Sequence, residues 1–412
     1  MSSGRPLEGI KVVELTTYLA APTCGRILGE WGADVIKIES VNGDPWRFYG
    51  ASLGTPTTPD ENPVFDFCNA NKKNLALDIK DPKGMEILHK LLSEADIFLT
   101  NNRVKALKKS GLDYDTLKER YPKLIYAMIN GFGEKGPDAE KPGFDTVAYW
   151  ASGGFMADLR LDEPGSYPIY TPAGVADVSC GTLLFGGICA ALYNRERTGK
   201  GDKITVSLFG TAVWTMGIMN TITQDKYGYQ YPKKRYDSKP VAIPYQCADG
   251  EWMMVTVLEY KRYFPTLCKV LGIPELANDP RYIDEPTMMQ PENKANLVRI
   301  FEERFRTKTA AEWDKLLTEA DIVHDRLRHF KEINKLEQVR VNRFMDEVTF
   351  RNGTKAWMPR PCIMSENLGY PDAEMSHYIG EDSKQVLSEL GYSEAEINEL
   401  VEKKVVKVFE RK

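Results

Sequence analysis

The sequence predicts an α/β protein with a Rossmann-like parallel sheet in its N-terminal half and a second folded unit farther along the chain. Three observations predict this organisation. Strand-like and helix-like runs alternate over roughly the first 130 residues, as they do in βαβ units. The chain has 412 residues, more than one domain usually contains. Residues 223–244 are rich in Tyr, Lys and Pro, a composition typical of a linker.

The alternating pattern gives a definite set of elements. Short apolar runs with β-branched residues indicate buried strands, and longer amphipathic segments indicate helices. The expected strands are residues 10–15, 33–39, 75–79, 96–100 and 124–129, and the expected helices are residues 21–31 and 82–95. Because helices separate these strands, neighbouring strands should run parallel.

A different unit is expected between residues 245 and 327. The turn dipeptide formed by Asp249 and Gly250 suggests a pair of short strands around it. The remaining expected elements are a helix at residues 310–319, strands at 345–350 and 355–358, and one or two helices within 383–403.

Composition argues against several classes of protein. The formal net charge is −5, with acids and bases mixed along the chain, so no nucleic-acid surface is expected. No apolar stretch approaches the roughly 20 residues that span a bilayer, and no signal peptide precedes the first strand. The seven cysteines are scattered without a C-x-x-C pair, as in a reducing compartment. We therefore expect a cytoplasmic protein without a membrane partner.

The loop after the first strand tests for a nicotinamide cofactor. A dinucleotide needs Gly-x-Gly-x-x-Gly there, so that the backbone can approach the pyrophosphate. Residues 16–22 read TTYLAAP, and the next glycine is Gly25. A dehydrogenase is therefore not expected. The sequence also contains no Walker loop and no histidine pair with metal-ligand spacing, so no metal site is expected.

The most unusual segment is residues 172–192, in which Asp177 introduces a long run of small and apolar residues. Its four glycines are Gly174, Gly181, Gly186 and Gly187. Inside a helix each would cost roughly 1 kcal/mol relative to Ala, which indicates close packing or a ligand near the backbone. Local sequence alone favours Asp177 as a helix N-cap. A role in binding or catalysis is compatible with capping, because a carboxylate at a helix start can also point into a cleft.

A second unusual segment, residues 130–145, is a Gly- and Pro-rich loop that follows an expected strand. Loops at the carboxyl ends of parallel strands are where ligands bind in such sheets. A plain long connection explains the same composition equally well.

Together, these motifs resemble those of the class III CoA-transferases, which include formyl-CoA, carnitine and phenyllactate transferases. In chain order the motifs are GIKVVELTTYLAAP, GADVIKIE, GDPWR, NANKKNLALD, ADIFLTN, GFGEKGPDAEKPGFD, GVADVSCG, ERTGKGDKITVSL and IGEDSKQVLSELGYS. The resemblance covers essentially the whole chain, and the order and spacing of the motifs are highly specific. Within the family the chain is most similar to the 2-hydroxyisocaproate and phenyllactate CoA-transferases, through NANKKNLALDIK and TKTAAEWDKLLTEADI.

The resemblance implies that Asp177 is a nucleophile. A protein carboxylate divides CoA exchange into easier acyl-transfer steps. Asp177 would attack an acyl-CoA to give a mixed anhydride, and the released thiolate would convert the anhydride to an aspartyl thioester. The acceptor acid would then reverse the sequence. Backbone amides near the helix start could stabilise the oxyanions.

The resemblance also implies a set of CoA-binding residues. These are Leu19, Ala20, Leu77, Lys80, Asn101, Asn102, Lys109, Lys141, Gly143 and Phe144. Asp145 matches a carboxylate beside the reaction centre and could support catalysis. Asn102 replaces an aromatic residue of the family pattern, and Ser40 stands where formyl-CoA transferase has an Arg against the adenine. The glycine-rich lid of that enzyme has no counterpart here.

The expected reaction moves CoA from an acyl-CoA, an enoyl-CoA in our interpretation, to a free (R)-2-hydroxy acid such as 2-hydroxy-4-methylpentanoate. The CoA thioester is then a substrate, and no permanently bound cofactor is expected. Residues 1–222 and 332–412 should form the large Rossmann-like domain, with a smaller α+β domain inserted at 223–331. The resemblance further implies a homodimer of two interlocked chains. Trp214, Met216 and Met219 could line an acyl pocket, although core packing is the favoured interpretation.

Two alternatives remain. A 2-methylacyl-CoA racemase of the same fold would place a His before the Asp of the Gly-x-Asp loop. Here the loop reads Gly143, Phe144, Asp145, and Phe144 cannot accept a proton. A non-catalytic acyl-CoA-binding accessory protein is the other alternative, and the presence of Asp177 does not decide against it.

Overall fold

The computed structural model describes residues 4–366 and 373–410. The chain divides into two compact units. The first unit comprises Met1–Phe155, Tyr170–Thr221 and Gln338–Lys412, and the second comprises Met156–Ile169 and Ile222–Glu337. The sequence prediction assigned residues 332–337 to the large domain, and they group with the second unit. It also assigned residues 156–169 to the large domain, whereas here they too group with the second unit. Backbone pairing explains the difference, because the Asp162 N–H donates to the Lys233 carbonyl over 2.9 Å.

A seven-stranded sheet forms the centre of the first unit in the described part of the chain. Its strands are β1 (Lys11–Leu15), β2 (Asp34–Glu39), β3 (Lys73–Leu77), β4 (Ile97–Thr100), β5 (Ile125–Asn130), β6 (Lys203–Ser207) and β12 (Val406–Lys407). The strand order is β12-β3-β2-β1-β4-β5-β6, and every neighbouring pair is parallel except β12 with β3. The six parallel strands thus follow the order 3-2-1-4-5-6 of the doubly wound Rossmann fold. The predicted parallel α/β sheet is confirmed.

Several helices of the first unit pack against this sheet. All described helices of the first unit and its connections are α1 (Ala20–Glu30), α2 (Trp46–Tyr49), η1 (Gly50–Leu53), α3 (Pro63–Asn69), α4 (Pro82–Glu94), α5 (Val104–Ser110), α6 (Tyr114–Arg120), the π-helix η2 (Asp145–Ala151), α7 (Phe155–Asp158), α8 (Val175–Thr198), α9 (Leu208–Thr215), α10 (Gly217–Ile222), α16 (Glu337–Val341), α17 (Ser383–Glu389) and α18 (Glu394–Glu402). The five predicted strands correspond to β1 to β5, with ends shifted by one or two residues. Strands β6 and β12 were not expected.

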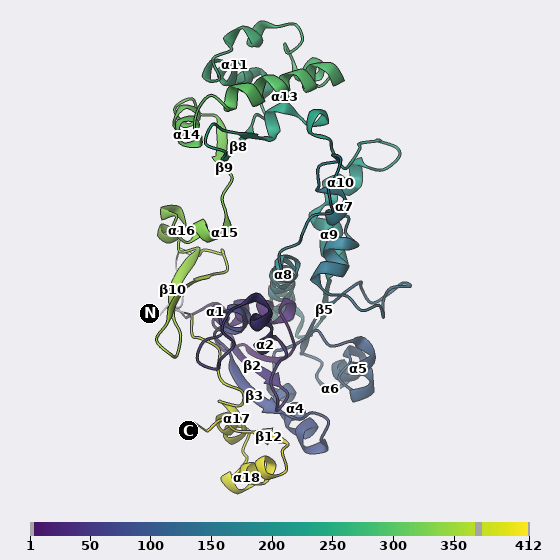
Figure 1. Ribbon diagram of the computed structural model, residues 1–412. Helices are drawn as coiled ribbons and strands as arrows, with labels where there is room; N and C mark the ends of the chain where they lie inside the picture. Colours follow the sequence, from purple (N-terminus) through teal and green to yellow (C-terminus); the bar gives the residue numbers. More distant parts are fainter. Residues whose placement is uncertain (1–3, 367–372, 411–412) are drawn as a thin grey trace. The chain divides into compact units, whose positions relative to one another are not determined.

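The C-terminal segment returns to the N-terminal sheet. Figure 1 shows α17, α18 and β12, in yellow, beside β3 and α4. The β12 strand pairs with Leu77 and Ala76 of β3, and Ser383 Oγ accepts the Ala76 N–H over 3.2 Å. Val386 and Leu387 of α17 belong to the same buried core as the apolar side chains of β1, β3 and α4. The large domain is therefore built from distant parts of the chain.

Helix α8 packs closely against α1, and this explains part of its glycine content. A methyl group on Gly181 would lie 2.6 Å from the Ala20 carbonyl oxygen, so only glycine lets the two helices approach this far. By length and composition alone α8 could cross a membrane, which corrects the expectation that no stretch is long and apolar enough. Much of the helix is nevertheless buried against neighbouring elements of the first unit.

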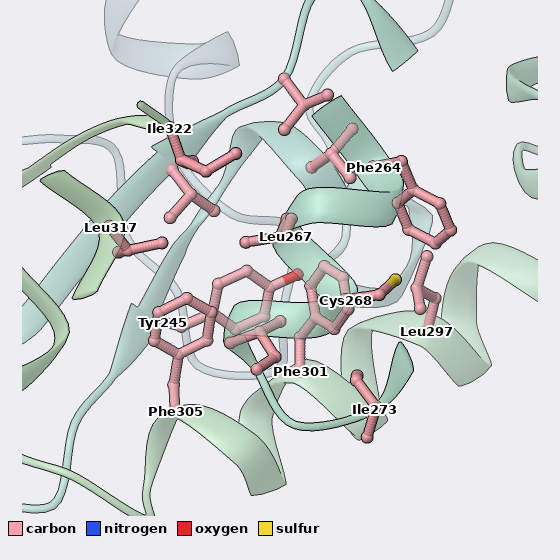
Figure 2. Packing of buried hydrophobic residues seen from close by; sticks show 14 of the residues in the cluster. Tyr245, Phe264, Leu267, Cys268, Ile273, Leu297, Phe301, Phe305, Leu317 and Ile322 are labelled. Carbon is pink, nitrogen blue, oxygen red and sulfur yellow. The ribbon is translucent and has the colours of Figure 1, made fainter. Parts of the chain in front are cut away.

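The second unit combines an antiparallel sheet with helices. Its strands are β7 (Pro244–Gln246), β8 (Trp252–Thr256) and β9 (Val323–Arg326), and its helices are η3 (Arg235–Asp237), η4 (Pro240–Ala242), α11 (Tyr260–Val270), η5 (Pro274–Asn278), α12 (Glu285–Met288), α13 (Pro291–Phe305), α14 (Ala310–Glu319) and α15 (Phe330–Ile333). The predicted strand pair around Asp249 is β7 with β8. Figure 2 shows the aromatic centre of its core, where Tyr245 stacks on Phe305 with ring centroids 5.0 Å apart.

A hairpin of β10 (Met345–Thr349) and β11 (Lys355–Pro359) belongs to the first unit. Both strands were expected from the sequence. Val348 and Met358 pack in a small apolar cluster with Phe350 and Met375. The hairpin thereby supplies apolar side chains near α3 and becomes part of a cavity wall described below.

Candidate active site

The candidate site lies where the loops after β1 and β4 diverge, which is the switch point of a doubly wound sheet. Two reciprocal hydrogen bonds join these loops. The Thr17 N–H donates to Asn101 Oδ1 over 3.0 Å, and Asn101 Nδ2 donates to the Thr17 carbonyl over 2.7 Å. Thr100 Oγ1 accepts the Asn102 N–H over 3.2 Å. Asn101 therefore shapes the floor of the crevice by fixing the first loop.

Two cavities flank this junction and share Thr17 and Asn102 as walls. Cavity A has a volume of about 400 Å³ and lies over the ends of β1, β2 and β3. Cavity B has a volume of about 340 Å³ and lies between the β4 and β5 ends and the loop 131–144. Their common walls make one crevice that can hold a long ligand with a polar head and a narrow arm.

Asp177 lines cavity B from the third residue of α8. The helix N-cap is Gly174, with φ of 84°, so the prediction that Asp177 is the N-cap is wrong. Capping is provided instead by Asp145, the first residue of η2. Its Oδ2 accepts the N–H groups of Ala176 over 2.9 Å and of Asp177 over 3.3 Å. Asp177 is thereby left free of the capping role and directed toward the cavity.

The environment of Asp177 favours its neutral form. Burial is the main cause, and the negative charge of Asp145 adds to it, so that the pKa of Asp177 rises to about 7. Burial also raises the pKa of Asp145, while the backbone N–H groups that it accepts oppose the rise. The two carboxyl groups are close enough for the charge of one to raise the pKa of the other. A carboxylate destabilised in this way is a better nucleophile than a solvated one.

The helix start does not offer its amides freely to a reacting group. The N–H groups of Ala176 and Asp177 are engaged by Asp145, and the Val178 N–H donates to the Gly174 carbonyl over 2.9 Å. The expectation that amides near this helix start stabilise oxyanions is thus not met by these three. The Ala176 and Asp177 amides hold Asp145 in place instead.

The sequence-predicted CoA contacts separate into three groups. Leu77, Lys80 and Asn102 line cavity A. Ala20, Asn101, Asn102, Lys141, Gly143 and Phe144 line cavity B together with Asp177. Leu19 and Lys109 lie elsewhere: Leu19 borders the third cavity described next, and Lys109 is exposed in the last turn of α5, outside the walls of these cavities within the described residues.

A third cavity, cavity C, borders the first turn of α8 and has a volume of about 660 Å³. Its walls are predominantly apolar and include Leu19, Trp46, Phe67, Val178, Trp357 and Met358. The same helical turn thus presents Asp177 to cavity B and Val175 and Val178 to cavity C. An apolar group could be bound next to the turn that carries the carboxylate.

Comparison with known proteins decides the family. The model of CoA-transferase family III matches residues 7–371 of the chain. The chain belongs to CoA-transferase family III. Asp177 and both cavities that surround it, B and C, lie within the matched residues.

Two characterised members of family III are similar over nearly their whole length. The (R)-2-hydroxy-4-methylpentanoate CoA-transferase of Clostridioides difficile is 41% identical over 97% of this chain and 99% of that enzyme. The cinnamoyl-CoA:phenyllactate CoA-transferase of Clostridium sporogenes is 39% identical over 98% of each chain. A crystal structure of a CaiB/BaiF family protein from Brucella suis has a TM-score of 0.77 and 29% identity, covering 94% of this chain and all of that one.

Several features of the family III site were missed or assigned differently from sequence. Tyr18 lines cavity B with φ of 63°. This left-handed backbone conformation is uncommon for a residue other than glycine, and no sequence pattern predicts it. Ser40 lines cavity A and donates its hydroxyl to the Gly43 carbonyl over 3.0 Å, so it shapes the turn instead of stacking on a base. Trp214 has 77% of its surface exposed, so the expected core packing is wrong for this residue.

The possible metal ligands in the described part of the chain are dispersed. Among residues 4–366 and 373–410, no three His, Cys, Asp or Glu side chains lie together in a way that could hold an ion. Asp145 and Asp177 are a pair of carboxyl groups, and Asp145 accepts backbone N–H groups. The arrangement suits acyl transfer by a carboxylate nucleophile.

Proposed function

We propose that this protein transfers CoA from an acyl-CoA to a free (R)-2-hydroxy acid with an apolar side chain, through an aspartyl-CoA thioester at Asp177. The observation that carries the proposal is the position of Asp177, a carboxyl group with its pKa raised to about 7, on the wall of the crevice at the sheet's switch point. The family supports CoA transfer, and the names of the two similar enzymes support a 2-hydroxy acid as acceptor.

Four substitutions at carbonyl carbons complete one turnover. An oxygen of Asp177 attacks the thioester carbonyl of the donor, the C–S bond breaks, and a CoA thiolate and a mixed anhydride result. The thiolate attacks the aspartyl carbonyl and releases the donor acid, leaving the enzyme thioester. The acceptor carboxylate then attacks this thioester and expels CoA thiolate, which attacks the acceptor acyl carbon and regenerates the Asp177 carboxylate. No proton needs to enter or leave overall.

The crevice supports binding of the CoA portion. In the proposal, cavity A takes the nucleotide and Lys80 faces its phosphates, while the pantetheine arm follows cavity B past Asn102 toward Asp177. Lys141, whose Nζ lies 4.8 Å from the centroid of the Phe132 ring, is held over this cavity by a cation–π contact. The donor that fits this scheme is an enoyl-CoA, because its acyl chain is also apolar.

Cavity C supports an apolar acid. Burial of each additional CH₂ stabilises a complex by about 0.8 kcal/mol. An acid with the three further carbons of a 4-methylpentanoate, compared with lactate, should gain about 2.4 kcal/mol, or about 50-fold in kcat/KM. Val178→Thr keeps the side-chain volume but adds a hydroxyl to the wall of cavity C. It should therefore reduce the preference for 2-hydroxy-4-methylpentanoate over lactate. Val213→Thr is the matched control, since Val213 is 45% exposed on α9.

The mechanism is tested by trapping the intermediate. The protein is incubated with an acyl-CoA, reduced with borohydride, and digested for mass spectrometry. A reduced aspartyl residue at position 177 is expected in the wild type and not in Asp177→Asn, which should still bind CoA. Intact acyl-CoA bound to an unmodified wild-type protein would refute the transferase proposal and favour an acyl-CoA binder.

Assembly and cellular location are part of the same proposal. The resemblance to family III transferases supports a homodimer, and the scattered free cysteines support a reducing compartment, the cytoplasm. Light scattering coupled to gel filtration should give twice the mass of 46.6 kDa for one chain. A monomeric mass in the active preparation would refute the dimer but would not contradict the proposed mechanism at Asp177.

A further inference from the structure

The Tyr18 ring connects the walls of cavities B and C. It meets the Phe144 ring edge-on, with centroids 5.2 Å apart and planes at 71°, and it meets the Trp46 ring at 6.3 Å and 64°. Phe144 lines cavity B, and Trp46 lines cavity C. Three aromatic rings therefore form a row at the side of the crevice where Asp177 lies.

The row depends on an unusual backbone conformation. Tyr18 has φ of 63°, and a non-glycine residue held there costs on the order of 1 kcal/mol. Hydrogen bonds on both sides offset the cost. Asp44 Oδ1 accepts the Tyr18 N–H over 3.2 Å and also the Trp46 N–H over 2.9 Å. Asn101 clamps the preceding residue from the other side. Asp44 thus fixes two of the three aromatic residues at once.

Asp44 is itself the end of a buried chain of alternating charges. Lys37 Nζ lies 3.0 Å from Asp44 Oδ2 and 3.4 Å from Glu14 Oε1, and Lys72 Nζ lies 2.9 Å from Glu14 Oε2. All four side chains are at most 5% exposed. Burial alone would lower the pKa of Lys37, but the neighbouring carboxylates, Asp44 first, outweigh it and raise that pKa. Asp44 is therefore fixed by two backbone N–H groups on one oxygen and by Lys37 on the other.

We propose that Tyr18 and Phe144 form an aromatic cover that keeps water from the aspartyl thioester, and that Asp44 is the positioning residue of this cover. The inference rests on the proposed function, because it concerns the intermediate at Asp177. Water is the competing nucleophile: its attack on the aspartyl carbonyl breaks the C–S bond, releases CoA thiol and returns the carboxylate. The rings of Tyr18 and Phe144 line the same cavity as Asp177, and apolar rings beside the reacting carbon exclude water from it.

The test compares hydrolysis with transfer. Free thiol released from an acyl-CoA without acceptor is measured against acyl-CoA product formed with 2-hydroxy-4-methylpentanoate. Tyr18→Ala and Phe144→Ala should each raise the ratio of hydrolysis to transfer about tenfold, equivalent to about 1.4 kcal/mol. Tyr18→Phe keeps the ring and should leave the ratio unchanged. Tyr167→Ala is a control for loss of a Tyr at a site 83% exposed.

Asp44 needs a readout that a merely structural role would not change. Asp44→Ala, which removes the oxygen that accepts the Tyr18 and Trp46 N–H groups, should raise the same ratio at a temperature well below unfolding. In the double variant with Tyr18→Ala it should add nothing further, because both changes remove the same cover. A purely structural role for Asp44 would instead lower both rates together and add to the effect of Tyr18→Ala.

The outcomes separate this inference from the proposed function. If Tyr18→Ala and Phe144→Ala both transfer CoA at the wild-type rate and keep the wild-type ratio of hydrolysis to transfer, the aromatic cover is refuted and the proposed transferase function is not. A wild-type protein that forms no thioester overturns the transferase and the cover with it. Loss of transfer in Tyr18→Ala without any gain in hydrolysis assigns the ring to substrate binding and also overturns the cover.

Discussion

Replacing Asp145 by Asn should move the pH profile of the first chemical step downward. The pKa of Asp177 is about 7 against an ordinary value of 3.8, a rise worth about 4 kcal/mol. Burial is the larger cause and the Asp145 charge the smaller, so the charge accounts for less than half of the rise. We expect the midpoint in Asp145→Asn to fall by about one pH unit, or about 1.4 kcal/mol. The Asn oxygen can still accept the Ala176 N–H, so the helix cap should survive.

The assay is the rate of enzyme–CoA thioester formation in a single turnover, measured by intact-protein mass spectrometry between about pH 5 and 9. The wild-type rate should rise with pH as Asp177 ionises, with a midpoint near pH 7 and a plateau above about pH 8. Asp138→Asn removes the same charge from an exposed position of the same loop and should leave the midpoint unchanged. A midpoint in Asp145→Asn that equals the wild-type value, or exceeds it, would refute the assignment of Asp145 as a source of the raised pKa.

Three further predictions concern stability and binding. Because the folded-state pKa of Asp177 lies above its unfolded value, the ionised group destabilises the fold increasingly between about pH 4 and 7; Asp177→Asn should therefore stabilise the protein in denaturant unfolding by more at pH 8 than at pH 5. Gly25→Ala places a methyl group 1.8 Å from a buried carboxylate oxygen and should lower the free energy of unfolding by about 2–3 kcal/mol. Gly186→Ala meets open space among the described residues and should stabilise α8 by up to about 1 kcal/mol. Equal melting temperatures of the two variants would contradict this. Lys80→Ala should raise KM for acyl-CoA about fivefold without changing kcat, and Lys109→Ala should change neither.

The sheet could be predicted because its strands are buried on both faces. Strands β1, β4 and β5 are short apolar runs separated by helical segments, and this pattern is local in the sequence. Strand β12 could not be predicted in the same way. It is only two residues long, and it exists because Leu77 lies opposite Val406, a partner more than 300 residues away.

The site was predictable to the level of its residues but not of their roles. The motif around Asp177 predicts a nucleophile there by resemblance, and the structure places this side chain on the cavity wall. Local sequence favoured Asp177 as the helix cap, but the capping side chain is that of Asp145, 32 residues earlier in the chain. The missing information is tertiary: no pattern near Asp177 states which distant carboxylate reaches the start of its helix. The same holds for Tyr18, whose conformation depends on Asp44.

The position of β12 has a consequence for the order in which the protein is completed during synthesis. The second unit ends at Glu337, so all its strands and helices are available to fold while the last part of the chain is still being translated. The sheet of the first unit has β3 as its edge until Val406 and Lys407 emerge. During that interval the β3 edge presents unpaired backbone groups, which neighbouring nascent chains could pair with. Slow translation of the final segment should therefore affect the yield of soluble protein more than its activity per molecule.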